Sequence, residues 1–185
     1  MFIAASCHGF IRERGNRMFN RAIVIFPQFN NVRLINEIRE KYDPLFDYIA
    51  PHITLVFPFA SNISTSELIK YIKQSLVGVG KFSLAIRRIT GSSDGYIFLD
   101  VKKGNDKIIE MHDKLYEGLL KEHHNRFIPY FPHLTLGRLR YEKMHQEIVK
   151  SLFTFDEIFE IEVEEVVVVR LDEEEKSIIE YIHNF

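Results

Sequence analysis

The chain of 185 residues has no tryptophan, one cysteine and six prolines. Its single cysteine, Cys7, excludes an internal disulfide and any metal cluster built from several cysteines, and it fits a reducing compartment, so we expect a cytoplasmic protein. No apolar run approaches the roughly 20 residues that cross a bilayer, so the sequence predicts no membrane helix. The formal net charge of −2 lacks the basic excess of a broad nucleic-acid-binding surface.

The N-terminal segment does not read as part of a folded core. Residues 1–7 are apolar but have neither the basic start nor the long apolar stretch of a signal peptide, and residues 8–17 are polar and charged. We interpret residues 1–17 as an extension or an upstream start that is poorly ordered. Residues 18–185 contain no Gly-, Pro- or Ser-rich linker, so we expect one domain with two lobes.

A five-residue phrase occurs twice in this sequence. It reads Pro51-His52-Ile53-Thr54-Leu55 and then Pro132-His133-Leu134-Thr135-Leu136. With only eight histidines in the chain, two matching copies are hard to explain by composition. A pair of histidines can supply a general base and a general acid to one reaction near neutral pH.

Both copies have the apolar, β-branched or leucine-rich character of short strands. Because side chains alternate along a strand, His52 and Thr54 should share one face, and His133 and Thr135 should share the equivalent face of the second strand. The apolar residues between and after them, Ile53, Leu55 and Phe57 in the first copy and Leu134 and Leu136 in the second, then point into the core. Each strand should therefore present an imidazole and a hydroxyl together.

Hydrophobic periodicity predicts about seven strands and four helices in the remaining sequence. The strands are expected over residues 21–26, 52–57, 81–89, 96–102, 133–139, within 157–170 and over 177–182, and the helices over 31–42, 65–77, 105–122 and 142–151. Hairpins are mixed with helix-linked strands, so pure parallel βαβ winding does not fit. The pattern predicts an α+β fold in which two lobes each offer one motif strand to a shared cleft.

The two motifs would have the following chemistry if their shared cleft held a cyclic phosphodiester, the substrate class implied by the family resemblance described in the next paragraph. One neutral imidazole can take a proton from an attacking water, the other can protonate the departing ribose oxygen, and two threonine hydroxyls can donate hydrogen bonds to the phosphate oxygens. This reaction needs no metal, and the residues suggest no carboxylate cage for one. The sequence leaves open which histidine is the acid.

The two motifs, with Tyr42-Asp43-Pro44 upstream and Gly137-Arg138 after the second copy, resemble the signature of the 2H phosphoesterase superfamily, which includes 2'-5' RNA ligase-like proteins and cyclic phosphodiesterases. The resemblance covers residues from Met18 to the C-terminus. It implies two pseudo-symmetric lobes of antiparallel sheet, with helices packed outside and the motif strands facing a central cleft. It also implies His52 and His133 as catalytic residues, with Thr54 and Thr135 on the phosphate.

The resemblance further implies a hydrolase that works without a cofactor. Its substrates would be 2',3'-cyclic phosphates of RNA 3' ends or of small cyclic nucleotides, opened to a 2'-phosphate, and the reverse 2'-5' RNA ligation is a known activity of the group. We expect a monomer, because nothing in the sequence demands a dimer.

Three further residues are weaker candidates for the pocket. Tyr130 and Phe131 lie just before the second motif strand and could form a wall, whereas alternation puts Arg138 on the face opposite His133, where a structural salt bridge is as good an interpretation. We interpret the other six histidines as structural or surface residues. Two other functions stay open: a non-catalytic protein that binds nucleotides or RNA ends in the same cleft, and a histidine-metal phosphohydrolase.

Overall fold

The computed structural model describes residues 18–174 and 176–185, so the extension predicted over residues 1–17 lies outside the described residues. Within this part of the chain there are eight strands and four α-helices. In chain order they are β1 Phe19–Ile25, α1 Val32–Tyr42, β2 Ile53–Ser61, α2 Thr65–Ser75, β3 Phe82–Gly91, β4 Tyr96–Lys103, α3 Asn105–Tyr116, β5 His133–Arg138, α4 Glu142–Ser151, β6 Ile158–Val163, β7 Glu165–Leu171 and β8 Ser177–Asn184.

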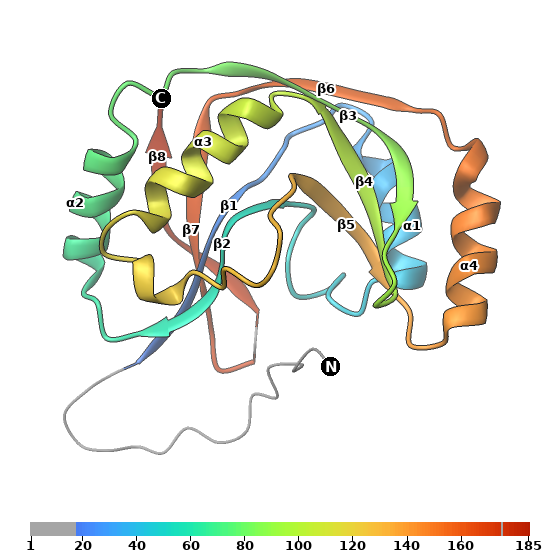
Figure 1. Ribbon diagram of the computed structural model, residues 1–185, viewed down its shortest axis with the longest axis horizontal. Helices are drawn as coiled ribbons and strands as arrows, with labels where there is room; N and C mark the ends of the chain where they lie inside the picture. Colours follow the sequence, from blue (N-terminus) through green and yellow to red (C-terminus); the bar gives the residue numbers. More distant parts are fainter. Residues whose placement is uncertain (1–17, 175) are drawn as a thin grey trace.

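The strands form one sheet in the order β6-β3-β4-β5-β2-β1-β7-β8, and every neighbouring pair is antiparallel. The two motif strands, β5 and β2, are the central pair. Figure 1 shows the sheet curling into a half-barrel, with α2 and α4 outside its two flanks. The predicted fold class is therefore confirmed: each lobe is one half of a single curled antiparallel sheet.

The two halves repeat one unit. β1, α1 and β2 form a strand–helix–motif-strand unit in one half, and β4, α3 and β5 form the same unit in the other. Each helix packs against the motif strand of the opposite half, α1 against β5 and α3 against β2. The apolar core lies on this helix-covered face, where residues such as Ile53, Leu134 and Met111 are fully buried.

Strand β2 is longer than expected. It continues through Pro58 to Ser61, although the proline was predicted to end it at residue 57. The pairing of β2 with β1 slips between Val56 and Phe59, so Pro58 lies in a β-bulge. A proline at a bulge gives up no ladder hydrogen bond, and the strand can continue past it.

Helix α3 ends at Tyr116 and is therefore shorter than the predicted span of residues 105–122. The hydroxyl of Tyr71, on α2, donates to the carbonyls of Lys114 and Leu115 and accepts from the Gly118 N–H at 3.0 Å. A side chain from the neighbouring helix thus satisfies the end of α3. A 3₁₀ turn over Lys121–His123 follows.

The C-terminal region contains one more strand than expected. The run over residues 157–170 divides into β6 and β7, which lie in opposite halves of the sheet, β6 beside β3 and β7 between β1 and β8. The valines of β7 are buried, as is typical of a strand inside a sheet. No helix within residues 18–174 and 176–185 has the length and apolarity of a membrane span.

Candidate active site

The two motifs meet at the centre of the sheet. Ile53 of β2 pairs directly with Leu134 of β5, and both side chains are fully buried on the helix-covered face. His52 and Thr54 flank Ile53, so they lie on the opposite, concave face together with His133 and Thr135. The antiparallel register sets His52 alongside Thr135, and His133 alongside Thr54. All four side chains are half-buried.

Both histidines are held in the same way. The Nδ1 of His52 lies 2.9 Å from the carbonyl oxygen of Ala50, and the Nδ1 of His133 lies 2.8 Å from that of Phe131. A carbonyl oxygen can only accept, so each Nδ1 carries the hydrogen. In the neutral form the Nε2 atom of each ring therefore carries no hydrogen and is a base. The two motifs therefore share the Nδ1–H tautomer of their histidine as well as the residue type.

Each motif strand also carries a β-bulge at its leucine. On β2, Thr54 pairs with Val24 and the next pair is Val56 with Ile23, so Leu55 is extra. On β5, Thr135 pairs with Phe98 and the next pair is Gly137 with Ile97, so Leu136 is extra. A bulge reverses the alternation of the residues that follow it. The two motifs are thus repeated in backbone conformation, which was not expected from the sequence.

The bulges correct two sequence-based expectations. Arg138 was expected opposite His133, but it pairs with Tyr96, whose ring stacks on Phe98 at 5.6 Å, on the same face as Thr135. Its guanidinium lies 4.6 Å above the Tyr96 ring centroid, which is a cation–π contact. Phe57 was expected in the core but is only half-buried, and its ring meets that of Tyr130 edge-on at 6.3 Å.

The tight approach of α1 explains the glycine after the second motif. A Cβ atom on Gly137 would lie 2.6 Å from the Cβ of Tyr42 and 2.7 Å from its carbonyl oxygen. The next residue, Asp43, forms a buried ion pair with Arg39 at 2.8 Å, and Arg39 donates to the carbonyl of Ile49. The end of α1 therefore packs on one motif strand and fixes the loop that leads into the other.

Of the two predicted wall residues, Phe131 lies at the site. Its ring is 4.7 Å from that of His133 and meets Phe98 edge-on at 5.4 Å, and Phe98 itself is 4.0 Å from His133. Tyr130 points the other way. Its hydroxyl donates to the Thr54 carbonyl at 2.8 Å and its ring stacks on His112 at 3.6 Å, so it contacts the backbone of β2 and not the concave face.

Tyr130 belongs to a group that satisfies an open strand edge. β2 and β5 separate after the single pair Ile53–Leu134, which leaves backbone groups of β2 without a strand partner. The Leu55 carbonyl accepts from His112 at 2.8 Å, and the Phe57 N–H donates to the Tyr116 hydroxyl at 3.0 Å. His112 is buried, as a structural histidine should be. Its contact with the motif bulge was missed, because periodicity placed it only on the apolar face of a helix.

Burial dominates the electrostatics of the two motif histidines. It lowers the pKa of His52 below 6.5, and the nearby Arg39 and His133 lower it further, against the Ala50 carbonyl and Asp43. Burial also lowers the pKa of His133, against the raising effects of the Phe131 carbonyl and Asp100. Both imidazoles therefore favour the neutral form more than a histidine in water does.

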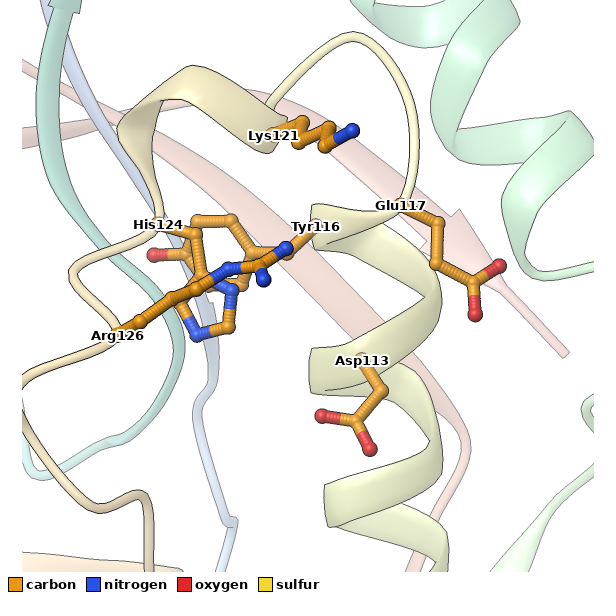
Figure 2. Close-up of a pocket in the computed structure, with 6 residues that line it drawn as sticks. All are labelled: Asp113, Tyr116, Glu117, Lys121, His124 and Arg126. Atoms are coloured by element: carbon orange, nitrogen blue, oxygen red, sulfur yellow. The ribbon is translucent and has the colours of Figure 1, made fainter.

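A surface hollow of about 430 Å³ lies at the C-terminal end of α3. It is lined by Asp113, Tyr116, Glu117, Lys121, His124 and Arg126. Figure 2 shows Asp113 and Glu117 on the helix, and Lys121, His124 and Arg126 on the segment that follows it. None of the predicted site residues lines it. Across residues 18–174 and 176–185, His, Cys, Asp and Glu side chains form no group of three that could hold a metal ion.

Comparison with known proteins places this geometry in a family. The 2'-5' RNA ligase superfamily model matches residues 27–175. A "Putative phosphoesterase" of Geobacillus kaustophilus is 33% identical over 122 residues, covering 63% of this chain and 67% of its own. One from Bacillus licheniformis is 23% identical over 133 residues, 70% of this chain and 77% of its own.

Solved structures agree in fold. Escherichia coli LigT in its apo form matches with a TM-score of 0.65 at 15% identity, over 91% of this chain and 98% of that one. LigT has also been solved with 3'-AMP, and that structure matches with a TM-score of 0.64 at 14% identity, over 91% of this chain and 99% of that one. By its family match and its curled antiparallel sheet, this chain belongs to the 2'-5' RNA ligase superfamily of 2H phosphoesterases.

Proposed function

We propose that the protein is a phosphoesterase that opens a cyclic phosphodiester by two-histidine acid–base catalysis. The proposal rests on the two motif histidines lying on one concave face of the sheet. In each of them the Nδ1–H donates to a backbone carbonyl, so that Nε2 is the atom available for proton transfer. One neutral imidazole takes a proton from water as the oxygen attacks phosphorus. The other, protonated, gives its proton to the ribose oxygen that leaves.

Thr54 and Thr135 have the proposed role of phosphate ligands. Each is half-buried beside the histidine of the opposite motif, so its hydroxyl can donate to a non-bridging oxygen from the side. Arg138 joins them as an anion ligand, because the bulge at Leu136 brings its guanidinium to the same face. This set stabilises the charge of the phosphorane without a metal ion.

The proposed substrate is a 2',3'-cyclic phosphate, on an RNA 3' end or on a small nucleotide. The rings of Phe98, Phe131 and Tyr96 beside His133 and Arg138 offer apolar faces on which a base can stack. LigT, which shares the fold, has been solved with 3'-AMP and with ATP. The product would be a 2'-phosphate, and the same groups could run the reverse 2'-5' ligation.

The test is hydrolysis of a panel of 2',3'-cyclic nucleotides, and of a short RNA ending in a 2',3'-cyclic phosphate, with excess chelator. His52→Ala and His133→Ala should each abolish turnover with an unchanged melting temperature. His123→Ala is the matched control, because His123 packs on Phe59 away from the motif pair. Binding of the cyclic nucleotide without turnover would favour the non-catalytic alternative, and chelator-sensitive turnover would favour a metal phosphohydrolase.

A further inference from the structure

The two histidines occupy equivalent positions but have different neighbours. Ile25 pairs with Ile53 on one side of the pseudo-symmetry, and Leu99 pairs with Leu134 on the other. The next position along β4 is Asp100, which pairs directly with His133. The residue after Ile25, just past the end of β1, is Phe26, and its ring meets that of His52 edge-on at 6.2 Å. A carboxylate therefore stands beside one histidine where an uncharged ring stands beside the other.

Asp100 is fixed in place on the concave face. One of its carboxylate oxygens accepts from the Thr90 hydroxyl at 2.6 Å, and the other from the Lys102 ammonium at 2.8 Å. The Asp100 side chain is 21% exposed and that of Lys102 is 44% exposed. The lysine charge is screened by water more than the carboxylate is, so the carboxylate dominates the field at His133.

The remaining charges around the histidines do not offset this difference. His52 faces the buried ion pair of Arg39 and Asp43, whose opposite charges largely cancel. Arg138 lies beyond Thr135, over the ring of Tyr96. His133 also lowers the pKa of His52, so protonation of one ring disfavours protonation of the other. One proton shared between the rings should go to the ring beside the carboxylate.

We propose that Asp100 is a positioning residue that keeps the shared proton on His133, so that His133 is the general acid and His52 the general base. This assignment rests on the proposed function. A water molecule attacks phosphorus and passes a proton to Nε2 of His52. The bond from phosphorus to the leaving ribose oxygen breaks, its electron pair stays on that oxygen, and the oxygen takes the proton from Nε2 of His133. Exchange with solvent then restores the starting protonation states.

The carbon and proton resonances of the imidazole rings test where the proton resides, independently of turnover. We expect an NMR titration of the full chain to show His133 titrating at higher pH than His52. Asp100→Asn keeps the oxygen that accepts from Thr90 but removes the charge, so it should lower the His133 midpoint, and Asp100→Glu should restore it. Glu162→Gln, on the outer strand β6, is the control for net charge. A His52 midpoint above that of His133, or a His133 midpoint unmoved in Asp100→Asn, would overturn the assignment.

Leaving-group dependence tests the catalytic roles. His133→Ala should lose on the order of a hundredfold or more with a ribose leaving group, but far less with a p-nitrophenyl phosphodiester, because nitrophenolate leaves without a proton. His52→Ala should lose activity on both. The reverse pattern would refute this division of roles while leaving two-histidine catalysis standing. If the wild-type protein turned over neither substrate, the proposed function would fail, and the titration alone would decide the location of the proton.

Discussion

Adding one methyl group at Gly137 should disrupt the packing that joins the two motifs. The new Cβ of Gly137→Ala would lie 2.6 Å from the Cβ of Tyr42, 2.7 Å from its carbonyl oxygen and 2.9 Å from its carbonyl carbon. These atoms belong to backbone or are fixed directly to it, so no side-chain rotation can relieve the clash. Either the end of α1 or strand β5 must move.

The expected cost is that of overpacking a well-filled core, about 1–3 kcal/mol in the free energy of unfolding. For a chain of this size, each kcal/mol lowers the melting temperature by roughly 2–4 °C. The displaced end of α1 also carries the Arg39–Asp43 pair, which holds the loop before His52. We therefore expect kcat for cyclic phosphate hydrolysis to fall even where the variant is fully folded.

Gly80→Ala is the matched control. A Cβ atom on Gly80 would meet no heavy atom within 4 Å beyond its chain neighbours, and the backbone there is not left-handed. Alanine at this position should leave stability unchanged or raise it by up to about 1 kcal/mol, through the unfolded chain. Chemical denaturation and the kinetics of both variants are the assay. Equal melting temperatures and equal kcat for the two variants would refute the packing role of Gly137.

Three other predictions follow from the site and its surroundings. The pH profile of kcat/KM should have its optimum below pH 6.5, because burial lowers the pKa of both His52 and His133. The general base stays neutral down to its lowered pKa, and the general acid loses its proton once the pH exceeds its own lowered pKa, so activity is confined to a window below 6.5. An optimum above pH 7 would contradict this. His112→Phe should destabilise the fold by about 1–3 kcal/mol, measured by denaturation, because the buried Leu55 carbonyl loses its donor; an unchanged midpoint would show that the bond is dispensable. Glu180→Ala should lower the free energy of unfolding by about 3 kcal/mol, because it leaves the buried Arg21 without its carboxylate partner. Glu164→Ala, which breaks an exposed ion pair with Lys81, should leave the denaturation midpoint unchanged.

Much of the fold follows from local sequence patterns. The helices over residues 32–42, 65–75 and 142–151 match their predicted spans within two residues, because each has one apolar face. Ser64 caps the second of them by accepting a hydrogen bond from the Glu67 N–H. The predicted C-terminal end of α3 was wrong, because the Tyr71 hydroxyl, 43 positions earlier in the chain, donates a hydrogen bond to the Lys114 carbonyl there. A contact of that sequence separation leaves no mark on local periodicity.

The candidate site was predictable in its residues but not in its backbone. The repeated His-x-Thr phrase indicated four side chains on one face, and the register of β2 with β5 agrees with that expectation. The bulges at Leu55 and Leu136 were not predictable, because the amino-acid pattern of these segments does not distinguish a bulged strand from a regular one. For that reason Arg138 was assigned to the wrong face, and Phe57, which is only half-buried, was assigned to the core.

Asp100 and Phe26 were missed for a different reason. Asp100 lies on β4 and Phe26 directly follows β1, and neither segment carries part of the motif. They lie beside the histidines only because β4 and β1 are neighbours of the two motif strands in the sheet. The order of the strands in the sheet is needed before they can be recognised as neighbours. The internal symmetry of the fold then makes their chemical difference visible.

The most direct test of the central claim is the rate of 2',3'-cyclic AMP hydrolysis in excess chelator, for the wild-type protein and for His52→Ala and His133→Ala. Two-histidine catalysis predicts chelator-resistant turnover that both substitutions abolish while the melting temperature stays unchanged. Turnover that persists near the wild-type rate in either folded variant would contradict it.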